Sequence, residues 1–392
     1  MTITEASPAP AETTGRPTAR PTTHDGWIAL AERIGAELAP DVAEHDRTGE
    51  ISRHAFDLLR AEGVTAALVP AEFGGGGISH ARLGGILRTL GRDDGATAVT
   101  LSMHAHVLGT QVWRHKHGLD ASKVFGAVVD RHAVLVSTGA SDWVSSSGTV
   151  REVDGGYRVS ARKMPASGCE VGDIAATSFR WDTAPDGPKV IHCSVPIDAE
   201  GVSIDLTWDT LGMRATGSHC LVFDDVFVPE AAVSLIRPAD EWHPLWNIVL
   251  GTAMPLIMSA YLGIADATVE LVRRIAAGRT DAHVVQLVGE MVNAHTTADD
   301  AIAAMFADAD DLRFENTDEL AARTLASKTV AADAIIDTVR LGIEATGGLG
   351  FTRSSVLERM YRDVHGSLFH PLPRAKQTRF SGRVALGHSP IG

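Results

Sequence analysis

The stretch TGGLGFTRSSVLERMYRDVHGSLFHP, residues Thr346–Pro371, carries more structural and chemical information than any other part of this chain. It begins with Gly347, Gly348 and Gly350, which have no Cβ and therefore let a backbone approach a group such as a phosphate closely. A plain helix-ending turn is the alternative explanation for these glycines. The stretch closes on the pair His370–Pro371, in a segment whose pattern otherwise predicts a helix.

Composition limits the class of protein. A length of 392 residues with 44% hydrophobic content is typical of a globular chain with two or three packed units. A formal charge of −14 argues against a nucleic-acid partner. The cysteines Cys169, Cys193 and Cys220 have no metal-ligand spacing, so no metal site is predicted, and their sparse, odd number favours a reducing cytoplasmic location. No uninterrupted run of about 18 apolar residues appears, so we expect no membrane span.

The hydrophobic period changes twice along the chain and predicts an α+β protein. Residues 1–25 are rich in Pro, Thr and Ala without an apolar centre, which predicts a disordered leader rather than a secretory signal. Residues 26–133 have the three- and four-residue spacing of an N-terminal all-α domain. Residues 134–236 alternate with a period of two, which predicts an antiparallel β-barrel or sandwich. Residues 237–392 return to the helical period and predict a four-helix bundle.

Four segments, in this order and spacing, are similar to motifs of the acyl-CoA dehydrogenase superfamily. They are the glycine loop Val69–Gly77, the turn Lys163–Gly168, the strand pair Leu211–Pro229 (LGMRATGSHCLVFDDVFVP) and the segment Gly347–Asp363. The resemblance implies an N-terminal helical domain, a middle β domain and a C-terminal helical bundle. It also implies a homodimer or homotetramer, because that family's flavin site is shared between chains.

The resemblance further implies a flavin held between the β domain and the bundle. FAD is expected, with FMN as the alternative, because the family's R-x-x-F-G element is missing from Arg273–Val285. Thr138 would contact the flavin pyrimidine, and Ala166, Ser167 and Gly168 would lie near N5. The glycines Gly347, Gly348 and Gly350 would face the pyrophosphate, typically from a neighbouring subunit.

Three further residues are candidates for substrate binding. Ser141 follows Thr138 in a shortened version of the family's threonine-to-aspartate stretch, His104 lies on the helix after the glycine loop, and Trp246 opens the bundle. Core packing is the alternative for the last two.

The chemistry at the end of the opening stretch leaves two functions open. Oxidation of an acyl thioester, with hydride transfer to flavin N5, needs a base for the α-proton. The positions where the family carries that carboxylate fall at about Pro371 and Trp246, and neither side chain can take a proton. His370 stands where related flavin monooxygenases, of the dibenzothiophene monooxygenase type, carry a histidine.

Such enzymes form a flavin C4a-hydroperoxide from reduced flavin and oxygen. His370 could assist there as the catalytic residue, because the ordinary histidine pKa lies near neutrality. The first hypothesis is therefore an FAD-dependent oxidoreductase acting on an acyl-CoA or acyl-carrier thioester. The alternative is a two-component flavin monooxygenase. The expected partners are a small-molecule acyl substrate and either a flavin reductase or an electron-transfer flavoprotein.

Overall fold

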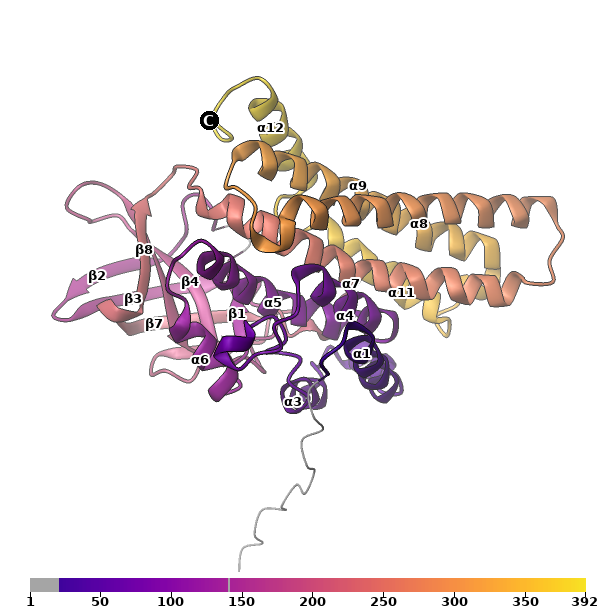
Figure 1. Ribbon diagram of the computed structural model, residues 1–392, viewed down its shortest axis with the longest axis horizontal. Coiled ribbons are helices and arrows are strands. Elements are labelled where there is room, and N and C mark those ends of the chain that lie inside the picture. The colour runs from indigo at the N-terminus through magenta and orange to yellow at the C-terminus, as the bar shows by residue number, and fades with distance from the viewer. Residues whose placement is uncertain (1–20, 140–141) are drawn as a thin grey trace, which may run out of the picture.

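The computed structural model describes residues 21–139 and 142–392. Figure 1 shows the two β-sheets at one end, the N-terminal helices beside α7, and a long helical bundle projecting from the other end. Most of the predicted leader, and Ser141, lie outside the described residues. The first helix already begins at His24, inside the predicted leader, because the Thr23 hydroxyl accepts a hydrogen bond from the Gly26 N–H at 3.1 Å and caps it.

The N-terminal part is helical, as the spacing of its apolar residues predicts. Side chains cap most of these helices; the Ser52 and Asp94 oxygens, for example, accept N–H bonds from Ala55 and Thr97. In the predicted glycine loop, a Cβ on Gly76 would lie 2.7 Å from the Ala67 carbonyl oxygen, so only glycine fits there. The helices are α1 His24–Leu38, α2 Val42–Thr48, α3 Arg53–Ala61, α4 His80–Asp93, α5 Gly95–Lys116 and α6 Ser122–Asp130.

The middle of the chain forms two four-stranded sheets with the orders β1-β4-β5-β8 and β2-β3-β7-β6. Apolar side chains such as Phe179 and Phe223 pack between them. Every pair is antiparallel except β1 with β4, because the chain leaves for the other sheet through β2 and β3 before it returns as β4. The strands are β1 Leu135–Ser137, β2 Thr149–Val153, β3 Gly156–Lys163, β4 Ile174–Trp181, β5 Lys189–Pro196, β6 Val202–Asp205, β7 Cys220–Pro229 and β8 Val233–Pro238.

The C-terminal part is the helical bundle. Its helices are α7 Leu245–Ala276, α8 Ala282–Ala309, α9 Asp318–Thr346, α10 Gly348–Phe351, α11 Val356–Val364 and α12 Arg374–Ala385. Short 3₁₀ turns lie at η1 Ala71–Phe73, η2 Arg214–Thr216, η3 Glu230–Ala232, η4 Asp310–Leu312 and η5 His365–Leu368.

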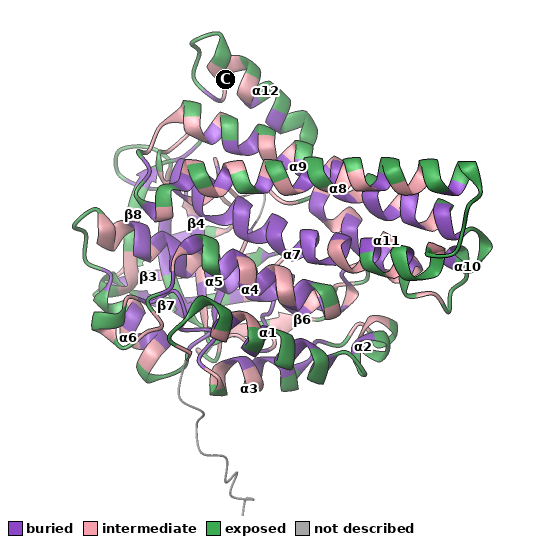
Figure 2. Cartoon of the chain, turned by 45° about the vertical axis from the view of Figure 1, so that its right-hand side comes forward, coloured by how far each residue is buried: buried purple, intermediate pink, exposed green. Residues whose placement is uncertain are grey.

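Helix α7 connects the parts of the molecule, since it packs against α4, α5, α8 and α9. Its length and composition would allow it to cross a membrane, although no such run was expected from the sequence. The most apolar window is 94% buried inside the protein, which makes α7 a core helix (Figure 2). Gly91 of α4 and Gly263 of α7 bring the two backbones into contact: a Cβ on either would clash with a carbonyl oxygen of the other helix.

Candidate functional site

A cavity of about 1320 Å³ lies between the sheet β1-β4-β5-β8, helices α5 to α7, and the segment that follows η5. Thr138, Ser167, Trp246 and His370, all proposed from sequence, line it. The other predicted residues in the described part of the chain, Ala166, Gly168, His104 and the three glycines of the opening stretch, do not line it.

Ser167 is the member of its turn that can reach a ligand. Its hydroxyl oxygen accepts a hydrogen bond from the Ser218 hydroxyl at 2.8 Å, which leaves the Ser167 hydrogen free to donate. Ala166 is fully buried, and its N–H bonds to the His219 carbonyl. Gly168 has φ +75°, and a Cβ there would lie 2.8 Å from Thr100 Cγ2. These two residues therefore shape the turn that presents Ser167.

Across the cavity mouth, the Thr138 hydroxyl donates to Thr177 Oγ1 at 2.7 Å and keeps its acceptor lone pairs. Thr138 and Ser167 thus offer one acceptor and one donor to the same cavity. A ring system with polar atoms along one edge, such as a flavin, fits this pair.

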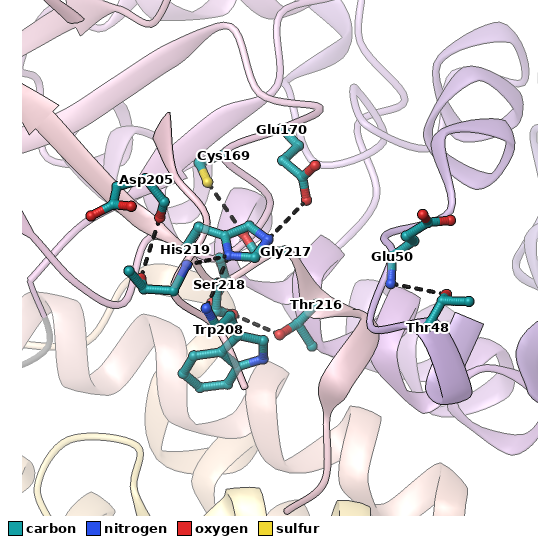
Figure 3. Close-up of polar contacts among 12 residues, drawn as sticks. Thr48, Glu50, Cys169, Glu170, Asp205, Trp208, Thr216, Gly217, Ser218 and His219 are labelled. Carbon is teal, nitrogen blue, oxygen red and sulfur yellow. Dashed lines mark hydrogen bonds and ion pairs between the residues drawn. The ribbon is translucent and has the colours of Figure 1, made fainter. Parts of the chain in front are cut away.

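His219 fixes the loop that carries a cavity tryptophan, Trp208 (Figure 3). The His219 Nδ1 accepts the backbone N–H of Thr207 at 3.1 Å and of Trp208 at 3.0 Å, and its Nε2 lies 3.3 Å from Glu170 Oε2. The Trp208 indole N–H donates to the Met213 carbonyl at 2.9 Å, so the ring is held at both ends. Neither His219 nor Trp208 was singled out from sequence, because their contacts join segments that no local pattern connects.

His370 lies at the cavity beside α7. Its Nε2 is 3.0 Å from the Tyr261 hydroxyl, and the Lys328 ammonium donates to its carbonyl oxygen at 3.0 Å. Burial, reinforced by the nearby charges of Lys328 and His106, lowers the pKa of His370 to about 3. Burial also raises the pKa of Tyr261 and lowers that of Lys328 to about 8. His370 is consequently a neutral imidazole at neutral pH, and its ring nitrogens can exchange hydrogen bonds with Tyr261 and a ligand.

His104, a candidate for substrate binding from sequence, does not line the cavity. The His104 Nε2 bonds to the Thr65 carbonyl at 2.8 Å, and its Nδ1 accepts the Leu135 N–H at 2.9 Å, so the ring joins α5 to the loop after α3 and to strand β1. His106 lines the cavity instead. Side chains two positions apart on a helix face different sides. Because α5 is buried on nearly every side, its hydropathy pattern could not show which of His104 and His106 faces the cavity.

Trp246 lines the cavity as predicted. Its ring stacks on Trp143 at 4.7 Å with an interplanar angle of 15°. His192 and His243 line the same wall. Burial, followed by the charges of Arg237, His243 and Lys163, lowers the pKa of His192 to about 3.

The carboxylates at the cavity are already engaged. Among the described lining residues these are Asp120 and Asp142. Asp120 accepts the Ser122 N–H at 3.0 Å, and Asp142 forms an ion pair with Lys163. Pro371 lines the cavity beside His370. The described residues also contain no cluster of three or more His, Cys, Asp or Glu side chains suited to a metal ion.

The three glycines of the opening stretch lie elsewhere, where α9 ends and α10 begins. Leu349 and Phe351 beside them are 73% and 80% exposed, which leaves an uncovered apolar tip. A role for Gly347, Gly348 and Gly350 at a neighbouring subunit's flavin remains a prediction, as does the oligomer itself.

Comparison with known proteins gives one family. The model of the acyl-CoA dehydrogenase N-terminal domain matches residues 29–123, and that of the acyl-CoA dehydrogenase C-terminal domain matches residues 256–372. The chain is 29% identical to Bacillus subtilis YdbM, which carries the provisional name of an acyl-CoA dehydrogenase; the match covers 88% of this chain and 92% of YdbM.

Other relatives are named as nitrososynthases, hydroxylases or monooxygenases. The chain is 28% identical to the amino sugar nitrososynthase DnmZ of Streptomyces peucetius, over 92% of this chain and 93% of DnmZ. The structure of KijD3 in complex with FMN and a dTDP-linked amino sugar superposes with a TM-score of 0.83 at 25% identity, covering 94% of this chain and 95% of KijD3. Further relatives are named hydroxylases and monooxygenases.

Proposed function

This chain belongs to the acyl-CoA dehydrogenase superfamily, and we propose that it acts within it as the oxygenase component of a two-component flavin monooxygenase. It would receive reduced flavin from a separate reductase and transfer one oxygen atom from O₂ to a small molecule. The first hypothesis from sequence, oxidation of an acyl thioester, has little support, because most of the named relatives are monooxygenases and nitrososynthases.

One observation carries the proposal: His370 stands in a cavity whose described carboxylates are both engaged. Removing a proton from the α-carbon of a thioester calls for a free carboxylate within hydrogen-bond reach. A neutral imidazole beside a protonated phenol, Tyr261, can instead accept a hydrogen bond from a nitrogen or oxygen atom of a substrate and take its proton when that atom becomes acidic on gaining oxygen.

A flavin fits the residues present. Ser167 can donate to the ring edge, Thr138 can accept from it, and Trp208 provides an apolar face. When bound in its reduced form, the flavin supplies the two electrons that allow O₂ to give one oxygen atom to the substrate and the other to water. His370 accepts the proton that leaves the substrate atom being oxygenated, and Tyr261 holds the imidazole in place through its hydroxyl.

We infer that the substrate is an amine. The support is that DnmZ is named as acting on an amino sugar and that another relative is named an isobutylamine N-hydroxylase. An amine also loses a proton as its nitrogen gains oxygen, which suits a neutral histidine. We expect the enzyme to work in the cytoplasm, where reductases supply reduced flavin.

The test uses the full chain, a flavin reductase with NADH, and a panel of amines and amino sugars under ¹⁸O₂. We expect one ¹⁸O atom in the product, dependent on both the reductase and this chain. In a parallel anaerobic assay, the protein loaded with oxidised flavin is mixed with acyl-CoA thioesters. Bleaching of the flavin by a thioester, without ¹⁸O incorporation into any amine, would establish a dehydrogenase and overturn the proposal.

A further inference from the structure

The cavity wall formed by β5, the end of β8 and the start of α7 contains a histidine with a fixed tautomer, His192. Its Nε2 lies 3.0 Å from the Nε of Arg237. A guanidinium nitrogen only donates, so His192 Nε2 must be the accepting nitrogen and the ring proton must sit on Nδ1. The Nδ1–H has no hydrogen-bond partner within the described residues, and His192 lines the cavity.

His243 shows the same pattern on the other ring nitrogen. Its Nδ1 accepts the backbone N–H of Leu245 at 3.1 Å, so its proton sits on Nε2. No side chain or carbonyl in the described chain accepts that Nε2–H, and His243 also lines the cavity. Two neighbouring histidines therefore present donors, and no acceptor, to the same space.

Arg237, behind them, is a buried cation that forms no salt bridge with any described residue. It is 2% exposed, and its other donors bond to backbone carbonyls, those of Trp143, Val144 and Pro238, at 2.8 to 3.0 Å. The nearby carboxylate of Asp240 is held by Arg180 through two hydrogen bonds. Burying a charge without a counter-ion is costly, so the positive potential of this wall calls for an anion from outside the chain.

Two further features of this wall also favour an anion. The indole N–H of Trp246, a side chain that is 9% exposed, has no hydrogen-bond partner in the part of the chain that the structure describes. Helix α7, 32 residues long, begins at Leu245 and directs the positive end of its dipole toward this wall.

We propose that this wall is an anion subsite, in which His192 Nδ1–H and His243 Nε2–H bind a phosphate or carboxylate group of a ligand in the cavity. Arg237 supplies the charge behind them and fixes the His192 tautomer. The anion has two possible sources, the phosphate of the flavin or an acidic group on the substrate. The ligand's role rests on the proposed function, whereas the binding itself does not.

The experiment compares the full-length protein with the double variant His192→Phe/His243→Phe, which keeps ring volume but removes both donors. Flavin fluorescence gives the Kd of FMN and of riboflavin, which lacks the phosphate. Calorimetry gives the Kd of inorganic pyrophosphate for the riboflavin-loaded protein. Charge-assisted hydrogen bonds of this kind are worth about tenfold in affinity or more.

If the flavin supplies the anion, the wild type binds FMN at least about tenfold more tightly than riboflavin and the variant loses that preference. If the substrate supplies it, pyrophosphate binding is lost in the variant and the FMN-to-riboflavin ratio is unchanged. A variant that matches the wild type for all three probes overturns the proposal. So does a wild type that neither prefers FMN nor binds pyrophosphate.

Two controls keep the outcomes distinct. Unchanged riboflavin affinity shows that the variant is folded; if it is not, the single variant His243→Phe, whose side chain is only partly buried, repeats the test. His365 also lines the cavity, but its Nδ1 donates to the Tyr361 carbonyl at 2.6 Å, which leaves an acceptor on Nε2. His365→Phe should therefore keep the phosphate preference. Anion binding without oxygenation of any amine would leave the subsite standing and refute the proposed function alone.

Discussion

The two ends of the cavity use histidine for opposite purposes. At one end, His370 faces the Tyr261 hydroxyl, which can both donate and accept, so the imidazole proton can sit on either nitrogen. At the other end, His192 faces Arg237, which can only donate. Burial lowers the pKa of both histidines to about 3, so the pKa does not distinguish them. The capacity of each partner decides whether a histidine can move a proton or only present one.

The largest expected effect is at the end that moves protons. His370→Ala should lower kcat for oxygenation by at least about 100-fold, because general acid–base assistance is typically worth that much. Flavin affinity should stay within about twofold, since His370 is not needed to hold the ring. Steady-state kinetics with saturating reduced flavin checks this. The matched control is His54→Ala, an exposed histidine on α3; a comparable loss there, or less than about threefold loss at His370, would contradict the comparison.

At the fixed end the main effect should be on stability. Arg237→Met leaves three backbone carbonyls and His192 without their donor, which should lower the free energy of unfolding by about 3 kcal/mol. Urea unfolding followed by circular dichroism measures it. An unchanged urea midpoint would mean that the free-energy cost of burying the Arg237 guanidinium equals the stabilisation from its hydrogen bonds.

The pH dependence of folding stability tests the buried, neutral histidines, which occur at both ends of the cavity and in the core. Burial lowers the pKa of His104 to about 4, below its value in the unfolded chain, so the unfolded state binds more protons between about pH 6.5 and 4. Stability should therefore fall as the pH falls through this window, by about 1 kcal/mol per pH unit for His104. Burial also lowers the pKa values of four other histidines, which should change stability in the same direction: His80, His106, His192 and His370. In urea titrations, His104→Gln should show a shallower slope than the wild type; an equal slope would count against a neutral, buried His104.

The smallest expected effect is at the loop that carries Trp208. His219→Phe removes the acceptor for the N–H groups of Thr207 and Trp208, which should destabilise the ordered loop by about 1 kcal/mol. Because the loop carries a wall of the cavity, KM should rise about fivefold with little change in kcat. Initial rates across substrate concentrations separate the two constants. A fall in kcat with constant KM would place His219 closer to the chemistry than the structure does.

The fold could be predicted from the sequence because the spacing of the hydrophobic residues changes where the chain passes from helices to strands and back. The alternation after Val134 and the helical spacing after Leu245 mark the sheets and α7 directly. Thr138, Ser167, Trp246 and His370, which line the cavity, could be proposed from the sequence because each falls at a position that has a counterpart in the family's motifs.

The rest depended on tertiary contacts. Arg237 and His192 lie on β8 and β5, 45 residues apart in sequence, and only the sheet brings them together. An arginine that bonds backbone carbonyls leaves no pattern of opposite charges to detect. His104 and His106 could not be separated because α5 is apolar on nearly every side.

The glycine contact between α4 and α7 has a consequence for how the chain is made. Because Gly91 and Gly263 bring these helices together at the backbone, the side of α4 that packs on α7 is covered only once the chain beyond residue 263 has been synthesised. During translation the first 130 or so residues therefore keep that face of α4 exposed to water until α7, which is encoded more than a hundred codons later, has been synthesised. The same close contact that joins α4 to α7 in the finished molecule therefore sets the point in synthesis at which that face can be buried.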